Sequence, residues 1–216
     1  IYQRWFADFA KEGGHRVNYQ AVGSGSGRKA FLDETVDFGA SDDPMKQGDI
    51  AKAKRGMVQI PMTGGTIAFG YNNPSCDLKL TQEQAVQVAI GEINNWNQVG
   101  CDEQPMTWVY RSDGSGTTAA FTNSMKAFSK KWKLGTGKSV AWPVGIGNKG
   151  NAGVAGNIRT TPGSIGYVNQ SYVKGEIRAA ELQNKNGDFV APTVESGALA
   201  LNGITLDENL AGTDPN

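Results

Sequence analysis

Apolar residues recur at two spacings along this chain, and each spacing predicts one kind of element. Near the start, Tyr2, Trp5, Phe6 and Phe9 follow the three- and four-residue spacing of one helix face, and Gly13-Gly14 interrupts the pattern. This segment is therefore predicted to be an amphipathic helix that ends at the two glycines.

Three other segments alternate apolar and polar residues, as half-buried strands do, and each leads through a small polar loop into a helical pattern. The predicted strands cover residues 17–21, 36–40 and 106–110. The loops that follow are 23–27, 41–44 and 111–118, and the predicted helices lie at 28–34, at about 49–55 and across Phe121, Met125 and Phe128. The order strand, loop, helix thus occurs three times.

The rest of the pattern is less regular. Strand-forming residues fill 57–71, and Gly163-Ser164-Ile165-Gly166-Tyr167-Val168 predicts a turn that runs into a buried strand. The segment Thr81-Gln82-Glu83-Gln84 predicts a capping box at the start of a helix that reaches Trp96, and no strong element is predicted beyond Leu206. Strands that alternate with helices indicate an α/β fold with a largely parallel sheet, in which ligands bind beyond the carboxyl ends of the strands.

The charge balance argues against two classes of partner. The sequence has 21 Lys and Arg residues and 21 Asp and Glu residues, and it contains no basic stripe. We therefore expect no nucleic-acid binding and no binding to a membrane surface. No apolar run approaches the roughly 20 residues needed to cross a bilayer, and the chain begins at Ile1 without a signal-like segment, so a trimmed, soluble product is expected.

The sequence contains two cysteines, Cys76 and Cys101, and both lie in polar stretches. Buried structural thiols normally lie among apolar residues, so a disulfide formed in an oxidising compartment is favoured over two free thiols. Closing a loop of this length would add about 3 kcal/mol to stability.

Three loops, 23–27, 39–43 and 111–118, each follow a predicted strand and precede a predicted helix. The start of a helix presents free N–H groups and a partial positive charge, so each loop is a candidate anion cradle. The third is the richest, because Ser115, Gly116 and Thr117 offer N–H groups and hydroxyls while Arg111 offers a two-pronged, charge-assisted contact. A flexible glycine turn or an ordinary capped turn is the alternative interpretation.

Two aspartates need separate explanations. Asp42 would repel a fully ionised anion, but it can accept a hydrogen bond from an anion that keeps a proton, as phosphate does at neutral pH and sulfate does not. Its alternative role is that of a solvated turn residue before Pro44. Asp113 either orients Arg111 or caps the helix that follows, and the sequence does not separate the two.

Catalysis, cofactors and metals have little support in the sequence. The single histidine, His15, lies in a polar turn with no cysteine or acid arranged around it, and neither a phosphate-binding P-loop nor a metal-ligand cluster is found; Gly137-Lys138-Ser139 has no strand before it. We expect a binding protein with no cofactor and no catalytic residue. A phosphatase that uses the same cradle and a fragment that binds nothing are the alternatives.

Four segments, in order, resemble the periplasmic phosphate-binding proteins of high-affinity phosphate ABC importers, and the likeness extends over nearly the whole chain. The matching segments are Val17-Asn18-Tyr19-Gln20 with Gly23-Ser24-Gly25, Val36-Asp37-Phe38-Gly39-Ala40-Ser41-Asp42, Arg111-Ser112-Asp113-Gly114-Ser115-Gly116-Thr117, and Gly163-Ser164-Ile165-Gly166-Tyr167-Val168.

The resemblance implies a two-lobed binding-protein fold with phosphate held in the cleft between the lobes by Ser24, Asp42, Arg111, Ser115, Gly116 and Thr117. It also implies a monomeric periplasmic or otherwise extracytoplasmic receptor whose partner is the membrane permease of an ABC importer. On this basis residues 1–71 are expected to form the first lobe and residues 72–216 the second. The first lobe is expected to be incomplete, because the family's glycine-threonine-phenylalanine loop and its long return segment are not found in this sequence.

Overall fold

A five-stranded sheet organises the larger part of the chain. The computed structural model describes residues 2–208 and 210–212, and the strand order is β4-β3-β5-β1-β6. These strands are β1 (Ile67–Tyr71), β3 (Thr107–Arg111), β4 (Ile146–Asn148), β5 (Ser164–Asn169) and β6 (Arg178–Ala179). β3 runs parallel to β4 and β5, whereas β1 is antiparallel to β5 and β6. The α/β class is confirmed, and the sheet is mixed.

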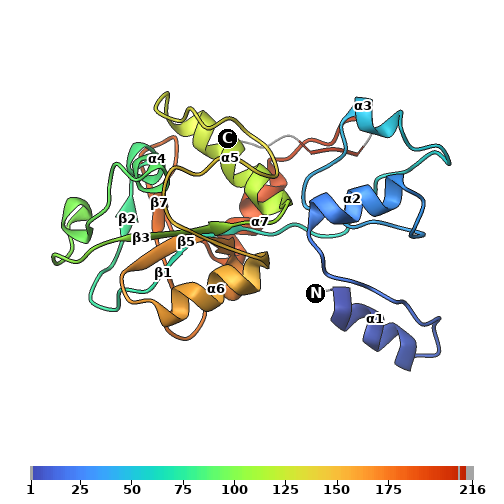
Figure 1. Cartoon of the computed structure of the whole chain (residues 1–216), viewed down its shortest axis with the longest axis horizontal. Coiled ribbons are helices and arrows are strands. Elements are labelled where there is room, and N and C mark those ends of the chain that lie inside the picture. Colours follow the sequence, from blue (N-terminus) through green and yellow to red (C-terminus); the bar gives the residue numbers. More distant parts are fainter. Residues whose placement is uncertain (1, 209, 213–216) are drawn as a thin grey trace.

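Helices cover both faces of this sheet (Figure 1). On one face lie α4 (Gln82–Ile90) and α5 (Gly116–Phe128), and on the other lies α6 (Gly150–Thr160). Successive side chains of β3 point to opposite faces of the sheet, so this strand contributes to a core on each face. Trp108 packs with Phe121 and Tyr167 on the α5 side, and Val109 packs with Val154 on the α6 side. A smaller sheet has the strand order β2-β7-β8 and is formed by β2 (Lys79–Leu80), β7 (Glu181–Gln183) and β8 (Phe189–Val190). Two short 3-10 helices are η1 (Trp96–Val99) and η2 (Gln170–Tyr172).

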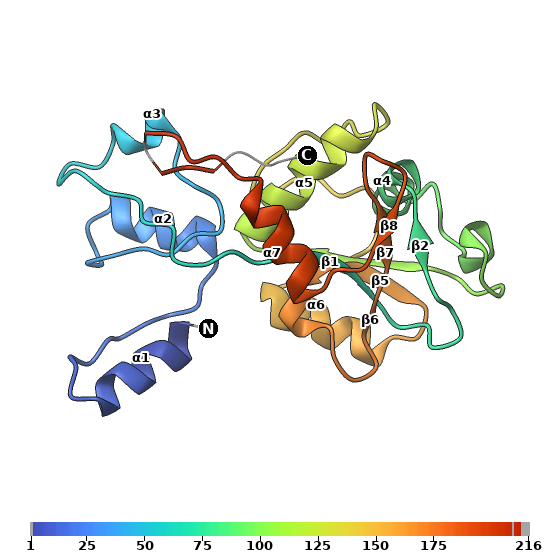
Figure 2. The same ribbon diagram turned by 180° about the vertical axis from the view of Figure 1, so that it is seen from behind.

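Residues 2–66 lie to one side of the five-stranded sheet (Figures 1 and 2). They contain α1 (Tyr2–Lys11), α2 (Ser24–Leu32) and α3 (Gln47–Ile50), and an aromatic cluster of Tyr2, Phe6, Tyr19 and Phe38 holds α1 against the following chain. The strands predicted at 17–21 and 36–40 are wrong. A strand needs a neighbour to pair its N–H and C=O groups, and among the described residues these segments run without such pairing.

Several predicted boundaries shift. α2 begins at Ser24, inside the glycine run, and α3 covers 47–50 instead of 49–55. The capping box of Thr81 and Gln84 is present, but α4 ends at Ile90 because Gly91 adopts a left-handed conformation with φ 82°. The sequence pattern missed α6, whose glycines obscured its helical spacing, and α7 (Val194–Asn202), which begins with a capping box of Thr193 and Ser196.

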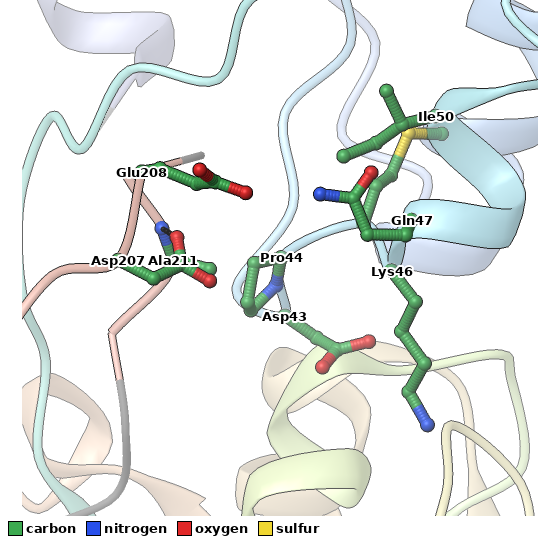
Figure 3. Close-up of a pocket in the computed structure, with 9 residues that line it drawn as sticks. Asp43, Pro44, Lys46, Gln47, Ile50, Asp207, Glu208 and Ala211 are labelled. Atoms are coloured by element: carbon green, nitrogen blue, oxygen red, sulfur yellow. Dashed lines mark hydrogen bonds between the residues drawn. The ribbon is translucent and has the colours of Figure 1, made fainter.

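The last described residues approach α3. α7 lies against the segment that enters β1, with Leu201 against Gly64 and Thr66 against Gly197. Beyond α7 the chain runs back towards α3 (Figure 2). Asp207, Glu208 and Ala211 line one side of a cavity of about 650 Å³, and residues 43–47 with Ile50 line the other (Figure 3).

The predicted disulfide is confirmed. Cys76 and Cys101 are bonded, with their Cα atoms 5.5 Å apart, and Cys76 is buried in the core that also contains Tyr71 and Trp96. Among the described residues, no helix has the length and apolar character needed to span a membrane.

Candidate functional site

Three segments distant in sequence meet where α5 begins. Gly116, the first residue of α5, lies so close to Ser24 and Asp42 that a methyl group on it would be 2.5 Å from the Ser24 hydroxyl oxygen and 2.9 Å from Asp42 Cβ. Arg111 stands at the end of β3, five residues earlier. The meeting point is therefore beyond the carboxyl end of a strand with parallel neighbours, as expected for a ligand site in an α/β fold.

Hydrogen bonds of the backbone fix this approach. The Gly25 amide donates to the Gly114 carbonyl at 2.8 Å, which ties α2 to the loop before α5. The Asp42 amide donates to the Ser24 hydroxyl oxygen at 3.1 Å. Gly23 takes φ 82° at the start of α2, and a methyl group there would lie 2.7 Å from an Asp113 carboxylate oxygen, so glycine is needed both for the turn and for the close approach.

Arg111 and Asp113 form a two-pronged ion pair. Arg111 Nε donates to Asp113 Oδ1 at 2.7 Å and Nη2 donates to Oδ2 at 2.6 Å, and both side chains are largely buried. The Gly150 amide, at the start of α6, also donates to Asp113 Oδ1 at 3.0 Å. Burial alone would raise the pKa of Asp113, but the hydrogen bonds from Arg111 and Gly150 and the charge of Arg111 hold the pKa below its usual value. Asp113 thus orients Arg111 and does not cap α5.

Thr117 links the remaining groups. Its hydroxyl donates to Asp42 Oδ2 at 3.3 Å and accepts from Arg111 Nη1 at 3.5 Å. The Asn151 side-chain amide, on α6, reaches the same hydroxyl at 3.4 Å. Arg111, Asp42 and Thr117 therefore face one another, although Asp42 is 75 residues from Thr117 in the sequence.

Ser115 is the N-cap of α5 and is fully buried. Its hydroxyl oxygen accepts from the Thr118 amide at 3.2 Å, and its own amide donates to the Lys138 carbonyl at 2.9 Å. The amides of Gly116 and Thr117 belong to the first turn of α5, where N–H groups have no partner within the helix and the helix dipole is positive. The start of α5 thus provides two anion-directed donors beside the Arg111 guanidinium.

Three residues near this site carried no site prediction. Tyr167, on β5, accepts from the Arg111 amide at 3.1 Å and bonds the Thr118 hydroxyl at 2.7 Å, so it joins the end of β3 to the start of α5. Burial raises the pKa of Tyr167 to about 12, with the bonds from Thr118 and Arg111 opposing the rise. Asn151 and Lys138 are the other two, and neither lies in a motif with site chemistry.

All six predicted site residues, Ser24, Asp42, Arg111, Ser115, Gly116 and Thr117, therefore belong to one continuous cluster. Hydroxyls, helix-start amides and a guanidinium provide donors, and Asp42 provides an acceptor. Together with sheets covered by helices and a second group of elements beside them, this arrangement resembles the fold class of the two-lobed α/β binding proteins.

The chain belongs to the PBP superfamily, since the family described as the PBP superfamily domain matches residues 1–216. It is 41% identical over 212 residues to the phosphate-binding protein PstS of Pasteurella multocida, covering 91% of this chain and 61% of that protein. It is 40% identical over 211 residues to PstS of Haemophilus influenzae, covering 91% and 63%. The chain thus spans less than two thirds of the length of these relatives.

Solved structures support the fold. A putative phosphate ABC transporter substrate-binding protein from Clostridium perfringens, solved with bound phosphate, superposes with a TM-score of 0.72 at 21% identity, over 90% of this chain and 73% of that one. An ancestral soluble variant of the human phosphate binding protein superposes with a TM-score of 0.78 at 19% identity, over 95% and 67%.

Proposed function

We propose that this chain is the phosphate-binding part of an extracytoplasmic receptor that delivers inorganic phosphate to an ABC importer. The observation that carries the proposal is the convergence of Ser24, Asp42, Arg111 and Thr117 on the first turn of α5. The relatives named phosphate-binding protein support this ligand. The ligand would replace the direct contacts that Thr117 now makes with Arg111 and Asp42.

Each group has a distinct role in this proposal. Arg111, oriented by Asp113, gives a charge-assisted contact, and the amides of Gly116 and Thr117 with the Ser24 and Ser115 hydroxyls complete the donor set. Asp42 accepts a hydrogen bond from the proton that phosphate retains, and it repels sulfate, which has no proton to donate. Selectivity then depends on one carboxylate among many donors.

Two lobes would close on the ligand by a hinge motion. The sequence suggested a division near residue 71, but β1 (Ile67–Tyr71) pairs with β5 and β6. We therefore assign residues up to about 66 to the first lobe and the elements from β1 to α7 to the second. Asp207, Glu208 and Ala211, which line the cavity together with α3, are assigned to the first lobe as well.

The proposed activity is capture and not catalysis. The single histidine, His15, is exposed and is not part of the site cluster, so no general base is assigned beside Ser115. The permease of the importer is the proposed membrane partner, and the receptor is proposed to act as a monomer. Sustained hydrolysis of a phosphate ester that is lost in Ser115→Ala would contradict this part of the proposal.

Calorimetric titration tests the function directly. Phosphate is expected to bind at one site, and sulfate is expected not to bind. Arg111→Ala removes the guanidinium and should weaken phosphate binding by about 1.5–3 kcal/mol, or roughly 10- to 150-fold. Equal affinity for the two anions, or normal binding by Arg111→Ala, would contradict the site assignment.

A further inference from the structure

The loop around Lys138 touches both sides of the proposed ligand cleft. Its backbone is fixed to α5: the Gly137 amide donates to the Thr122 hydroxyl at 3.1 Å, and the Lys138 carbonyl accepts from Ser115. Its side chain reaches the other side, where the Lys138 ammonium lies 3.7 Å from Asp43 Oδ2. Lys138 thus contacts Ser115, at the start of α5, on one side of the proposed cleft. It also contacts Asp43, the residue next to Asp42, on the other side.

The partner of Lys138 is held rigidly. Arg28, on α2, donates to Asp43 Oδ2 at 2.9 Å and to Asp49 Oδ2 at 2.7 Å, and its side chain is 10% exposed. Asp49 also pairs with Lys52 at 2.9 Å. Asp43 is therefore preoriented by groups of its own part, and it needs no contact with Lys138 to keep its position.

Lys138 lies in a partly dehydrated environment. Burial lowers its pKa and the nearby Arg28 lowers it further, while Asp43 and Asp49 raise it. Its side chain is 27% exposed, so its pair with Asp43 is screened less by solvent than a pair on the open surface. The ammonium gains this pair only when the two parts of the chain lie against each other.

We propose that Lys138 is a positioning residue that latches the cleft closed through Asp43 and so slows the release of the anion. This inference rests on the proposed function and deepens it. Lys138 is assigned no contact with the ligand itself. It acts through the separation of the two parts, because opening the cleft breaks the Lys138–Asp43 pair while leaving the Arg28–Asp43 pair intact.

A latch and a steering charge have different kinetic effects. A charge that steers the anion changes the association rate, whereas a pair formed on closure changes the dissociation rate. Lys138→Met should therefore release radiolabelled inorganic phosphate about two- to five-fold faster in a chase with unlabelled phosphate, the range expected for a weak ion pair. Association should be unchanged, and Lys138→Arg should restore slow release.

Matched variants isolate the pair. Lys126→Met removes the same charge from an exposed position of α5 and should release phosphate at the wild-type rate. In an Asp43→Asn background, Lys138→Met should add nothing further, because the ion pair that it removes is already lost. Full additivity of the two changes, or a slower association with unchanged release, would overturn the latch.

Small-angle X-ray scattering without phosphate separates the latch from the proposed function. The radius of gyration of Lys138→Met should exceed that of both the wild type and Lys126→Met. If the wild-type chain binds no phosphate, the proposed function is wrong. The scattering result then still tests whether Lys138 holds the two sides of the cleft together. Equal radii for the three proteins would refute the latch whatever the chain binds.

Discussion

In the proposed phosphate site, Asp42 is the acceptor among groups that donate, and its contact with the Thr117 hydroxyl holds it towards Arg111. Asp42→Asn keeps the shape but replaces the carboxylate by an amide that can donate. Sulfate should then bind measurably, and the preference for phosphate over sulfate should fall at least ten-fold in calorimetry. Asp37→Asn makes the same charge change at a nearby exposed residue and should leave the preference intact.

Gly116 is the glycine of the proposed site with the least room for a side chain. Gly116→Ala places a methyl group against the Ser24 hydroxyl and Asp42, so phosphate affinity should fall by more than ten-fold while the melting temperature changes little. Gly156→Ala is the matched control, since a methyl group there meets no heavy atom within 4 Å and should stabilise α6 by about 0.4–1 kcal/mol. Unchanged affinity in Gly116→Ala would show that the approach seen here is not needed for binding.

The sequence pattern indicated the members of the cluster that lie in local loop motifs, but it gave no signal for Lys138 and Asn151. Arg111 to Thr117 form one strand-to-helix loop, so their composition alone indicated a candidate anion cradle. Lys138 and Asn151 reach the cluster only through tertiary packing, from positions after α5 and within a glycine-rich segment. Their local sequences have no spacing that distinguishes them from surface residues.

At the scale of elements, Asp113 joins the end of β3 to the start of α6 through Arg111 and the Gly150 amide. Its pKa is lowered in the folded state, so its contribution to stability is complete above the pKa of an unfolded aspartate, about 3.9, and is lost as the pH falls through the folded value. The midpoint of urea unfolding should therefore decrease on acidification below about pH 4. Asp113→Asn should be less stable at pH 7 and should lose this component of the acid dependence.

Four elements were predicted well, namely two strands that have neighbours in the sheet and two helices that pack on it. β3 and β5 follow their predicted strand pattern because their side chains are buried in the cores on both sides of the sheet, and α4 and α5 follow theirs because each buries one face in the larger core. Residues 17–21 and 36–40 have the same alternation, yet they form no ladder among the described residues. An alternation of apolar and polar residues therefore indicates a segment that can form a strand, and the strand forms only where a neighbouring strand pairs with it.

At the scale of the molecule, the Cys76–Cys101 disulfide closes a loop of 25 residues that contains β2, α4 and η1. Replacing both cysteines by alanine should lower the free energy of unfolding by about 3 kcal/mol, because the unfolded chain gains freedom. Phosphate affinity should stay within two-fold of the wild type, since β2 lies on the side of the sheet away from α2 (Figure 1). A large loss of affinity would show that this loop supports the cleft directly.

The contact between residues 64–66 and α7 has a mechanical consequence. The chain leaves the α1–α3 side through residues 64–66, which lie against α7, and it returns towards that side just after α7 (Figure 2). The two connecting segments would act together as a hinge. They would allow the α1–α3 side to rotate towards and away from α5, and they would oppose sliding or twisting between the two sides. Each swing would then bring Ser24 and Asp42 back to α5 in the same alignment, without any search among competing arrangements.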